Sequence, residues 1–544
     1  MGMPQAAGRT SAEYHVSNPA IRRPGGSLLS PGCWIDTSCR KAASLWNLAA
    51  RRRQKIEAVS QPGGPPRFVR SVLLLALLTS FASPVAAAEK STVDLGARWE
   101  LFVDDFLVDR ARDAALKLHP PRRAEIVLTT DAPWEGPTSA YFSVLKDGDV
   151  IRLYYRGSVD GSDHSDNQVT CVAESRDGIH FTRPQFGLIE VKGTKANNVV
   201  WRGVESHNFA PFLDRNPHAA PDARYKALAG LKLPGRNWQQ GATPGGLYAF
   251  ASPDGIHWRK VQPEPVMTQG AFDSLNLAFW DSARARYTCY SRIFAHKVRA
   301  VQSAGSPDFL VWGEGTPNRY DAAVPAEHFY TSATLPCPGA EHLYVAFPMR
   351  FEPARQAVAA HQTPGVSDAV FLSSRDGVAW DRPFLEAWLR PGPDPKNWTD
   401  RSNMPAWGIV ESAPGEWSMY VSEHYRWPDH RLRRLVLPRH RLAAMHAGAR
   451  GGEFTTRPLH FRGHHLVLNY ATSAAGSLRV EVQDAAGRPL PGFAAADLSP
   501  LYGDELDATV RWKTDADLSP LRGQPVRLRF ILQDADLFAL RFAE

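Results

Sequence analysis

"SPDGIHW", residues 252–258, decides the fold, because the chain contains the same pattern three more times. Residues 174–181 read "ESRDGIHF", residues 374–380 read "SRDGVAW", and residues 306–312 read "SPDFLVW", a copy without the glycine. The serines of successive copies are 77, 54 and 68 residues apart. Periods of this length indicate supersecondary units and not a helical solenoid.

Each copy lies between two runs of alternating apolar and polar residues. Asp-Gly between such runs is typical of a β-hairpin, because the turn requires a positive φ that glycine adopts readily. The aromatic residue three positions after the glycine is expected to point into the layer between neighbouring sheets. We therefore predict that the repeated residues are structural and not catalytic.

A second series lies upstream of these turns: a strand that opens with polar residues, a short turn, and an aromatic strand. It occurs five times, at residues 134–157, 205–230, 272–292, 327–350 and 401–426. Five such units predict an all-β chain with a five-bladed β-propeller over residues 95–446, each blade lining the axis with its innermost strand. The strand-like segment 98–109 has no partner of its own and is expected to close the last blade, which removes an exposed edge.

Residues 1–88 are expected to be a presequence. An apolar run at 71–81 follows Arg67 and Arg70, and three alanines at 86–88 precede Glu89. This is the pattern of a secretory signal peptide at about 67–88, and the run is too short for a membrane span. We therefore predict a secreted or periplasmic protein with no membrane span.

The basic charge of the chain lies in this presequence. Residues 1–88 contain eleven Lys+Arg and three Asp+Glu, whereas the whole chain has a net charge of +7, so the remainder is close to neutral. The basic pI therefore gives no reason to expect a nucleic-acid partner. The sequence does not indicate an oligomeric state.

Three cysteines lie outside the presequence, namely Cys171, Cys289 and Cys337. They are far apart in strand-like segments, which leaves one disulfide pair or three buried free thiols as alternatives. No CxxC or HExxH spacing occurs, so no metal site is predicted from spacing.

The composition changes after Ala447, where the glycine-rich stretch "GARGGEF" precedes short alternating strands. Residues 452–544 are therefore predicted to form a small C-terminal β-sandwich. Because this segment contains few aromatic residues, packing against the propeller is favoured over carbohydrate binding as its role.

"WEGP" at 134–137, the repeated "SxDGIHW" and the order of five units resemble the propeller glycoside hydrolases of families 32 and 43, and most closely secreted bacterial proteins similar to family 32. The resemblance covers about residues 95–440, and family 32 enzymes also carry a C-terminal sandwich. It implies a secreted hydrolase of glycosidic bonds in poly- or oligosaccharides. The invertase signatures Trp-x-Asn-Asp-Pro-x-Gly and Arg-Asp-Pro do not occur here, which argues against sucrose or fructan as substrate.

Glycoside hydrolysis requires two carboxyl groups that flank the scissile bond. Asp273 and Glu327 open consecutive units at equivalent positions, and we predict them as the first catalytic pair. Glu135 in "WEGP" resembles the setting of the general acid in arabinanase-type enzymes and is a third catalytic candidate. The alternatives are ion pairing with Arg401 for the first two, and capping of backbone amides for Glu135.

Polar side chains at the same strand openings are candidates for binding sugar hydroxyls. Asp104 and Asp105 are adjacent, so alternation sends them to opposite faces and at most one serves the site. No cofactor is predicted, although His207 and His328 leave an axial calcium ion as an alternative to hydrogen bonding. The predicted substrate-binding residues are Asp105, Glu205, His207, Asn208, Asn276, His328, Arg401 and Asn403.

Three functions remain open from the sequence. The leading hypothesis is a glycoside hydrolase with paired carboxylates at the mouth of the propeller channel, acting on a carbohydrate substrate. The alternative is a propeller that binds carbohydrate without cleaving it. A third hypothesis, phosphorolysis or lyase action, requires a basic cluster at the mouth, for which the sequence identifies only Arg401 and His207.

Overall fold

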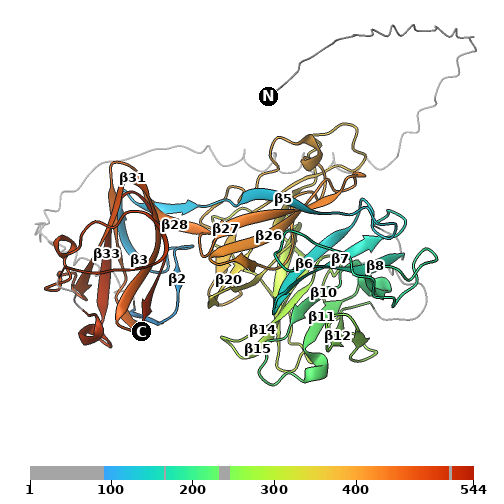
Figure 1. The fold of residues 1–544 in the computed structure, drawn as a ribbon, viewed down its shortest axis with the longest axis horizontal. Helices are drawn as coiled ribbons and strands as arrows, with labels where there is room; N and C mark the ends of the chain where they lie inside the picture. The colour runs from blue at the N-terminus through green and yellow to red at the C-terminus, as the bar shows by residue number, and fades with distance from the viewer. Residues whose placement is uncertain (1–90, 164–166, 232–244, 514–516) are drawn as a thin grey trace, which may run out of the picture. The chain divides into compact units, whose positions relative to one another are not determined.

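The computed structural model describes residues 91–163, 167–231, 245–513 and 517–544 (Figure 1). These residues form 33 strands and five short 3₁₀ helices without an α-helix, which confirms the predicted all-β fold. By its contacts, the chain from Ala86 to Glu544 is one compact unit. No helix in the described ranges is long and apolar enough to cross a membrane. The predicted signal peptide lies outside the described residues.

The first three sequence units each form one four-stranded antiparallel sheet, the pattern of a propeller blade. The first sheet contains β6 (Ala140–Asp147), β7 (Val150–Ser158), β8 (Gln168–Ser175) and β9 (Val199–Arg202). The second contains β10 (Ala210–Leu213), β11 (Tyr225–Ala229), β12 (Tyr248–Ser252) and β13 (Arg259–Lys260). The third contains β14 (Leu277–Asp281), β15 (Arg286–Ala295), β16 (Val298–Ser306) and β17 (Thr316–Pro317).

The fourth unit is divided between two three-stranded sheets. One contains β18 (Phe329–Thr331), β21 (Met349–Glu352) and β22 (Val366–Ala369); the other contains β19 (Leu335–Cys337), β20 (Ala340–Ala346) and β23 (Leu372–Ser374). The fifth unit contains β24 (Met404–Pro405), β25 (Val410–Ala413), β26 (Glu416–Glu423) and β27 (Arg431–Pro438). The 3₁₀ helices are η1 (Val204–His207), η2 (Pro221–Ala223), η3 (Pro395–Asn397), η4 (Ala495–Asp497) and η5 (Ser519–Leu521).

An N-terminal strand closes the last blade, but it is not the predicted one. β5 (Arg122–Thr129) pairs antiparallel with β27, with Leu128 opposite Leu432, and Figure 1 shows the blue β5 beside the orange β27. The predicted segment 98–109 instead contributes β2 (Glu100–Leu101) to the C-terminal sheet, where it pairs with β33 (Val526–Ala543). Alternation identified 98–109 as a strand, but it carries no information about which distant edge a strand joins.

The C-terminal strands form a ten-stranded sheet that also takes in the start of the described chain. Its long strands β31 (His465–Asp484) and β33 pair along most of their length, with a register shift between Thr472 and Ser477. The chain passes from the C-terminal sheet to the propeller between β4 and β5, whereas the sequence predicted that the propeller begins at residue 95. The other strands are β1 (Val93–Gly96), β3 (Val108–Arg112), β4 (Ala115–Leu118), β28 (Ala443–Ala447), β29 (Gly452–Thr456), β30 (Leu459–Phe461) and β32 (Asp504–Thr509).

The repeated motif forms the same turn in each copy. In the turn after β12, the amides of Ile256 and His257 donate to Asp254 Oδ1 over 2.9 Å, and the Gly255 amide donates to Ser252 Oγ over 2.9 Å. The copies at 175–180 and 374–379 repeat these bonds. Gly255 has a φ of 79°, as the hairpin interpretation requires.

These turns also join neighbouring blades. The hydroxyl of Tyr154 in the first blade donates to the Gly255 carbonyl in the second over 3.0 Å, and Tyr290 in the third donates to Gly377 in the fourth over 2.9 Å. Tyr420 in the fifth blade donates to Gly178 in the first over 2.7 Å, across the closure of the ring. The repeated motif is therefore structural, as predicted.

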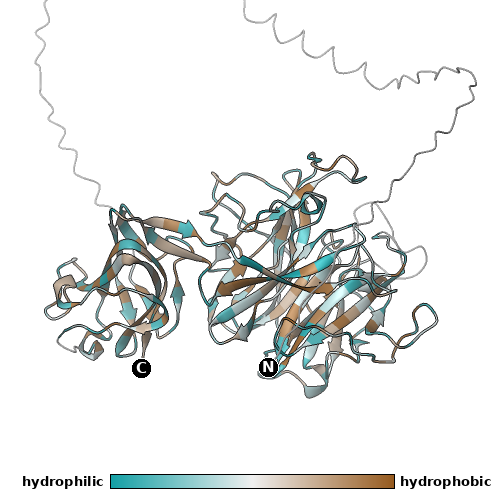
Figure 2. Cartoon of the chain, turned by 45° about the horizontal axis from the view of Figure 1, so that its top comes forward, coloured by the Kyte–Doolittle hydropathy of each residue, from teal (hydrophilic) through white to brown (hydrophobic). Residues whose placement is uncertain are grey.

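Hydrophobic residues alternate with polar ones along the strands, as the brown and teal segments of Figure 2 show. The largest buried cluster includes the Tyr287, Tyr290 and Tyr344 side chains of the third and fourth blades. Cys171, Cys289 and Cys337 are buried free thiols, which decides between the two alternatives for the cysteines. Close packing of this kind fixes the ends of the inner strands, where the candidate site lies.

Candidate functional site

Residues that open the inner strands of different blades meet at the propeller axis. His207, at the end of η1, lies 2.8 Å from Asp273 Oδ1 through its Nε2, and its ring centroid is 5.5 Å from that of Tyr141 on β6. The Arg401 guanidinium lies 5.9 Å from the ring centroid of Tyr330 on β18. Arg292, 3.5 Å from Asp273 and 5.3 Å from the Tyr330 ring centroid, links the two sets of contacts, so that His207, Asp273 and Arg401 lie in one group with residues from all five units.

Asp273 is the most accessible carboxylate of this group, with 28% of its side chain exposed. Burial alone would raise its pKa, but the hydrogen bond and charge of His207 and the charges of Arg292 and Arg156 hold the pKa well below its usual range. Burial and the charge of Arg156 lower the pKa of His207. Asp273 is therefore an ionised carboxylate at neutral pH, suited to act as a base or nucleophile and not as a proton donor.

Five arginines lie near Asp273 or near the carboxylates beside it, and we call them the axial arginine cluster: Arg156, Arg292, Arg299, Arg401 and Arg426. Asp163 pairs with Arg401 at 2.6 Å and with Arg426 at 2.9 Å, and Asp400 pairs with the same two arginines. Arg292 lies 3.5 Å from Asp273. Among the described residues, five guanidinium groups thus face three carboxylates, which leaves the axis positively charged.

Three arginines of the cluster each have a buried nitrogen without a hydrogen-bond partner in the described chain. The Nε atoms of Arg156, Arg292 and Arg299 are buried and make no hydrogen bond within the described chain. A buried donor without a partner is costly, so such groups are usually satisfied by solvent or by a ligand. The cluster therefore has the net positive charge to attract an anionic group.

Backbone strain coincides with the same cluster. Tyr141, Arg401 and Arg426 have φ values of 56°, 56° and 67°, in the left-handed region that side chains other than glycine rarely adopt. Strained residues of this type concentrate at functional sites, where surrounding contacts hold them in place. The strain therefore supports the axis as the functional site.

Glu327 lies apart from Asp273. It pairs with Arg350 at 3.1 Å and with Arg382 at 2.5 Å, and it lines a cavity of about 610 Å³ together with Asp368, Arg390 and other residues of the fourth blade. In the part of the chain that the structure describes, Asp273 and Glu327 share no ion-pair or hydrogen-bond partner. The predicted catalytic pair is thus not brought together by any such contact.

Glu135 is enclosed by its own contacts. Its side chain is buried, and it accepts hydrogen bonds from the Tyr155 hydroxyl at 2.5 Å, from Arg183 at 2.8 and 2.9 Å, and from the Ala132 amide at 3.1 Å. These bonds occupy both carboxylate oxygens. They favour the structural alternative, capping of a backbone amide, over a role as general acid.

Four further predicted binding residues make structural contacts. The Asn208 amide bonds to the Gly230 and Phe272 carbonyls, and the Asn276 amide bonds to Phe272 and Ser274. Asn403 donates to the Ser367 and Asn397 carbonyls, and Glu205 pairs with Lys260 at 2.5 Å on the outer strand of the second blade. Apart from the buried Asn276 Oδ1, which has no hydrogen-bond partner in the described chain, these polar groups are used within the protein.

The last two predicted residues lie in different places. His328 accepts from the Arg299 amide at 3.2 Å and thus borders the axial arginine cluster, and burial followed by the charge of Arg299 lowers its pKa. Asp105 is exposed and lines a separate cavity beside the fourth blade. Within the described ranges, no three His, Cys, Asp or Glu side chains are grouped so that they could hold a metal ion.

Sequence reasoning missed most of the axial arginine cluster, although a signal for it was present. The aromatic segments of four units carry an arginine at or next to their last residue, in "YYRG", "CYSR", "PMR" and "EHYR". Three of these, Arg156, Arg292 and Arg426, belong to the cluster, and the fourth, Arg350, pairs with Glu327. An arginine at the same point of successive units could have been taken as a basic ring around the axis.

Comparisons with known proteins give similarity to solved structures only. No protein-family model matches the chain, and no curated protein matches it. A glycosyl hydrolase from Bacteroides ovatus is 13% identical, covering 59% of this chain and 94% of that one, with a TM-score of 0.37. An N-acetylgalactosamine deacetylase from F. plautii, in complex with blood group B trisaccharide, is 14% identical over 59% and 94% of the two chains, with a TM-score of 0.38.

A third similar structure belongs to the GH130 family of mannoside phosphorylases, which contains glycoside hydrolases that target β-1,2 mannosidic linkages in Candida mannan. It is 14% identical, covers 62% of this chain and 96% of that one, and has a TM-score of 0.36. Similarity at this level does not place the chain in a family.

Proposed function

We propose that this protein is a secreted carbohydrate-active enzyme that cleaves a glycosidic bond next to a negatively charged group bound at the propeller axis. The observation that carries the proposal is the axial arginine cluster, in which Arg292 lies 3.5 Å from the ionised Asp273. The sequence resemblance to family 32 and 43 hydrolases and the predicted signal peptide support the enzyme class and its secretion. The charged group would be the carboxylate or sulfate of an acidic sugar.

The arginine cluster would position the substrate. A guanidinium presents a planar fork of donors that matches a carboxylate or sulfate, and such charge-assisted bonds are stronger than those between neutral groups. Anchoring the acidic group fixes the sugar ring relative to Asp273, which converts an encounter into an oriented complex. This anchoring explains why arginines outnumber carboxylates at the axis.

Asp273 would supply the reactive carboxylate. In hydrolysis the bond between the anomeric carbon and the glycosidic oxygen breaks, the carbon gains the oxygen of water, and the leaving oxygen gains a proton. An ionised Asp273 fits the half of this reaction that removes a proton from water or attacks the anomeric carbon. Glu327 remains our candidate for the second carboxyl group, which requires the substrate to reach from Asp273 to the cavity that Glu327 lines.

A second candidate function, phosphorolysis, is favoured by the same cluster. Inorganic phosphate can replace water as the nucleophile, so that the anomeric carbon becomes bonded to a phosphate oxygen while the leaving oxygen takes a proton. Phosphate binds well to grouped arginines. The two candidates differ in one respect that can be measured, which is whether cleavage requires phosphate.

The test is product release by the full chain from acidic and neutral plant and algal glycans, with and without phosphate. We expect cleavage of uronate- or sulfate-bearing glycans, loss of at least a hundredfold in kcat/KM for Asp273→Asn, and a raised KM for Arg292→Lys. Glu135→Gln is the matched control and should retain the axial chemistry. Activity confined to neutral glycans, or full activity of Asp273→Asn, would contradict the proposal.

The remaining outcomes separate the alternatives. Formation of a sugar 1-phosphate only when phosphate is present would identify a phosphorylase. Loss of activity in Glu327→Gln would restore the predicted pair of carboxylates. Binding of an acidic glycan without release of any product would establish a carbohydrate-binding propeller, and N-terminal sequencing of exported protein would test the cleavage before Glu89.

A further inference from the structure

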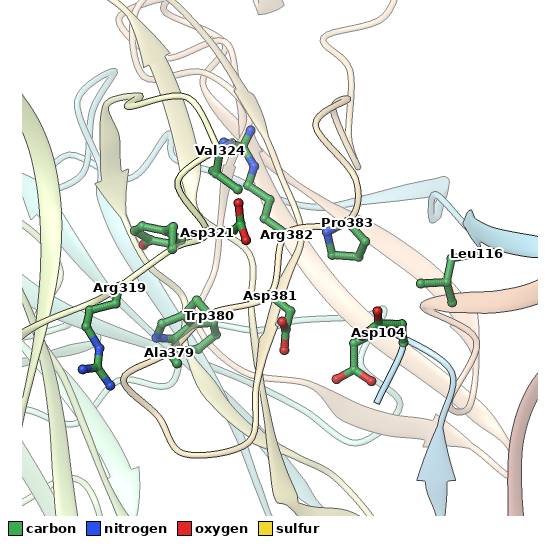
Figure 3. Close-up of a pocket in the computed structure, with 12 residues that line it drawn as sticks. Asp104, Leu116, Arg319, Asp321, Val324, Ala379, Trp380, Asp381, Arg382 and Pro383 are labelled. Carbon is green, nitrogen blue, oxygen red and sulfur yellow. The ribbon is translucent and has the colours of Figure 1, made fainter. Parts of the chain in front are cut away.

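A second cavity, of about 520 Å³, lies beside the fourth blade, and its lining includes none of the axial residues (Figure 3). One side is formed by Asp104, Asp105 and Leu116 from the N-terminal segment of the C-terminal sheet. The other side is formed by residues 319–324 and 379–383 of the fourth blade. The volume falls within the roughly 300–1,000 Å³ that is usual for small-molecule sites.

The walls of this cavity are held by hydrogen bonds. The Arg319 amide donates to the Val378 carbonyl, and the Trp380 amide donates to the Arg319 carbonyl, each over 2.8 Å. The Asp381 amide donates to the Ser373 carbonyl over 2.8 Å. The cavity is therefore part of the fixed structure of the blade and not a gap between mobile loops.

The charge of the cavity is negative and largely uncompensated. Asp105, Asp321 and Asp381 have no cationic partner among the described residues, and the opposing free charge is the single guanidinium of Arg319. The two remaining charged residues of the lining are neutralised elsewhere: Asp104 by Arg375, through two bonds of 3.0 Å, and Arg382 by Glu327. Three carboxylates of the lining thus form no ion pair, although the charge of Arg375 acts on Asp381.

The same cavity has apolar and aromatic surface next to its carboxylates. Tyr320, Trp380, Val324, Pro383 and Leu116 line it, and the buried Trp380 indole nitrogen has no hydrogen-bond partner in the described chain. A metal ion would require a cage of oxygen ligands. Carboxylates beside aromatic and aliphatic walls suit an organic cation, whose charged end pairs with the acids while its body contacts the walls.

Asp381 is the residue most affected by this arrangement. Figure 3 shows Asp381 and Asp104 entering from the two sides of the cavity. Burial and the negative charges of nearby aspartates raise the pKa of Asp381 to about 6, although the charge of Arg375 acts in the opposite direction. The aspartates are Asp104, Asp105 and Asp376. A bound cation would relieve this repulsion between carboxylates.

We propose that this cavity is a second binding site, distinct from the axial one, that takes a ligand through a protonated primary amine paired with Asp381 and Asp105, with Asp321 elsewhere on the lining. The amine could be supplied by an amino sugar or by a polyamine, since both present the same ammonium group. Binding should weaken as the pH falls through about 6, because Asp381 then loses its charge.

Calorimetric titration of the full chain at pH 7.5 tests the proposal with three probes: a glucosamine tetramer, its fully N-acetylated counterpart, and spermine. We expect at least one amine probe to bind, with the N-acetylated oligomer at least tenfold weaker than the free amine. Asp381→Asn and Asp105→Asn should each weaken binding at least fivefold. The control Glu190→Gln removes an exposed charge from the first blade and should bind like the parent.

The arms of the titration distinguish the sources of the amine: preference for the tetramer indicates an amino sugar, and preference for spermine indicates a polyamine. Equal affinity for amine and N-acetylated oligomers, unchanged affinity in both aspartate variants, or no binding of either amine at millimolar concentration would overturn the proposal. Asp273→Asn should bind the amine normally, so this result is independent of the axial site.

Discussion

Gly255 shows how one residue joins two blades. Its φ of 79° is costly for any side chain, and a Cβ at this position would lie 2.5 Å from the Tyr154 hydroxyl oxygen. That hydroxyl donates to the Gly255 carbonyl, so the same turn sets the backbone and binds the neighbouring sheet. Gly255 therefore serves both the turn and the interface, whereas the copy at 306–312 forms the same turn with Phe309 at a φ of 74°.

We expect Gly255→Ala to lower the free energy of unfolding by about 1–2 kcal/mol for the left-handed backbone, plus about 1–3 kcal/mol for the displaced Tyr154. Gly187 is the matched control, because its φ is 71° and a Cβ there would meet no atom within 4 Å. Gly187→Ala should show the backbone cost alone. Urea unfolding followed by tryptophan fluorescence measures both, and equal losses would show that the blade contact contributes nothing.

For individual residues, the roles of the candidate catalytic carboxylates were harder to predict than those of the residues of the repeated turn. The turn is a local pattern, so four copies in one sequence were enough to assign Ser252, Asp254 and Gly255 their structural roles. Glu135 and Glu327 open their strands much as Asp273 does, but distant arginines pair with them. These ion pairs depend on which segments become neighbours in the fold, and spacing along the chain does not predict those neighbours.

β5 is the element on which closure of the propeller depends. It forms the outer strand of the fifth blade through pairing with β27, across more than 300 residues of sequence. Leu128 on β5 is 5% exposed and packs in the cluster that joins the first and fifth blades, whereas Ile126 on the same strand is 45% exposed. The inner face of this strand therefore contributes more to closure than its outer face.

Leu128→Ala is expected to lower the free energy of unfolding by about 2–4 kcal/mol, because it removes a buried side chain and leaves a cavity at the closure. Ile126→Ala, on the exposed face, should change it by less than about 0.5 kcal/mol. Chemical denaturation of the two variants gives the comparison. Similar losses in both would mean that β5 contributes through its backbone pairing and not through its buried face.

The positions of the strands were predictable from the sequence, but the strands with which they pair were only partly predictable. Alternating runs and turn signals placed the five units where the sheets are found. The same alternation in 98–109 and 122–129 could not show that the first joins β33 and the second joins β27. Edge pairing is decided by long-range packing, which a local period does not encode.

At the scale of the whole molecule, a buried ionic junction connects the propeller to the C-terminal sheet. Arg375, in the repeated turn of the fourth blade, pairs with Glu100 at 2.6 Å and with Asp104 at 3.0 Å, and its guanidinium lies 3.8 Å from the Phe106 ring centroid. Trp99, Leu101 and other residues of the N-terminal segment share one hydrophobic cluster with the fourth and fifth blades. The two parts should therefore unfold together.

Arg375→Met is expected to lower the free energy of unfolding by about 3–5 kcal/mol at pH 7.5, because it leaves Glu100 and Asp104 buried without their cation. Without the arginine, burial should raise the pKa of both carboxyl groups above their unfolded values. A carboxyl group whose pKa is raised on folding gains stability as the pH falls through that value, so the loss should shrink at pH 5.

The triple variant Glu100→Gln, Asp104→Asn, Arg375→Met removes all three charges and should recover most of the stability, since neutral side chains carry a smaller desolvation cost than unpaired carboxylates. Urea unfolding at both pH values measures the three proteins. A loss in Arg375→Met that is the same at pH 7.5 and pH 5, or a triple variant no more stable than the single one, would show that the junction is held by hydrophobic packing. Two separate transitions in the single variant alone would show that Arg375 couples the propeller to the C-terminal sheet.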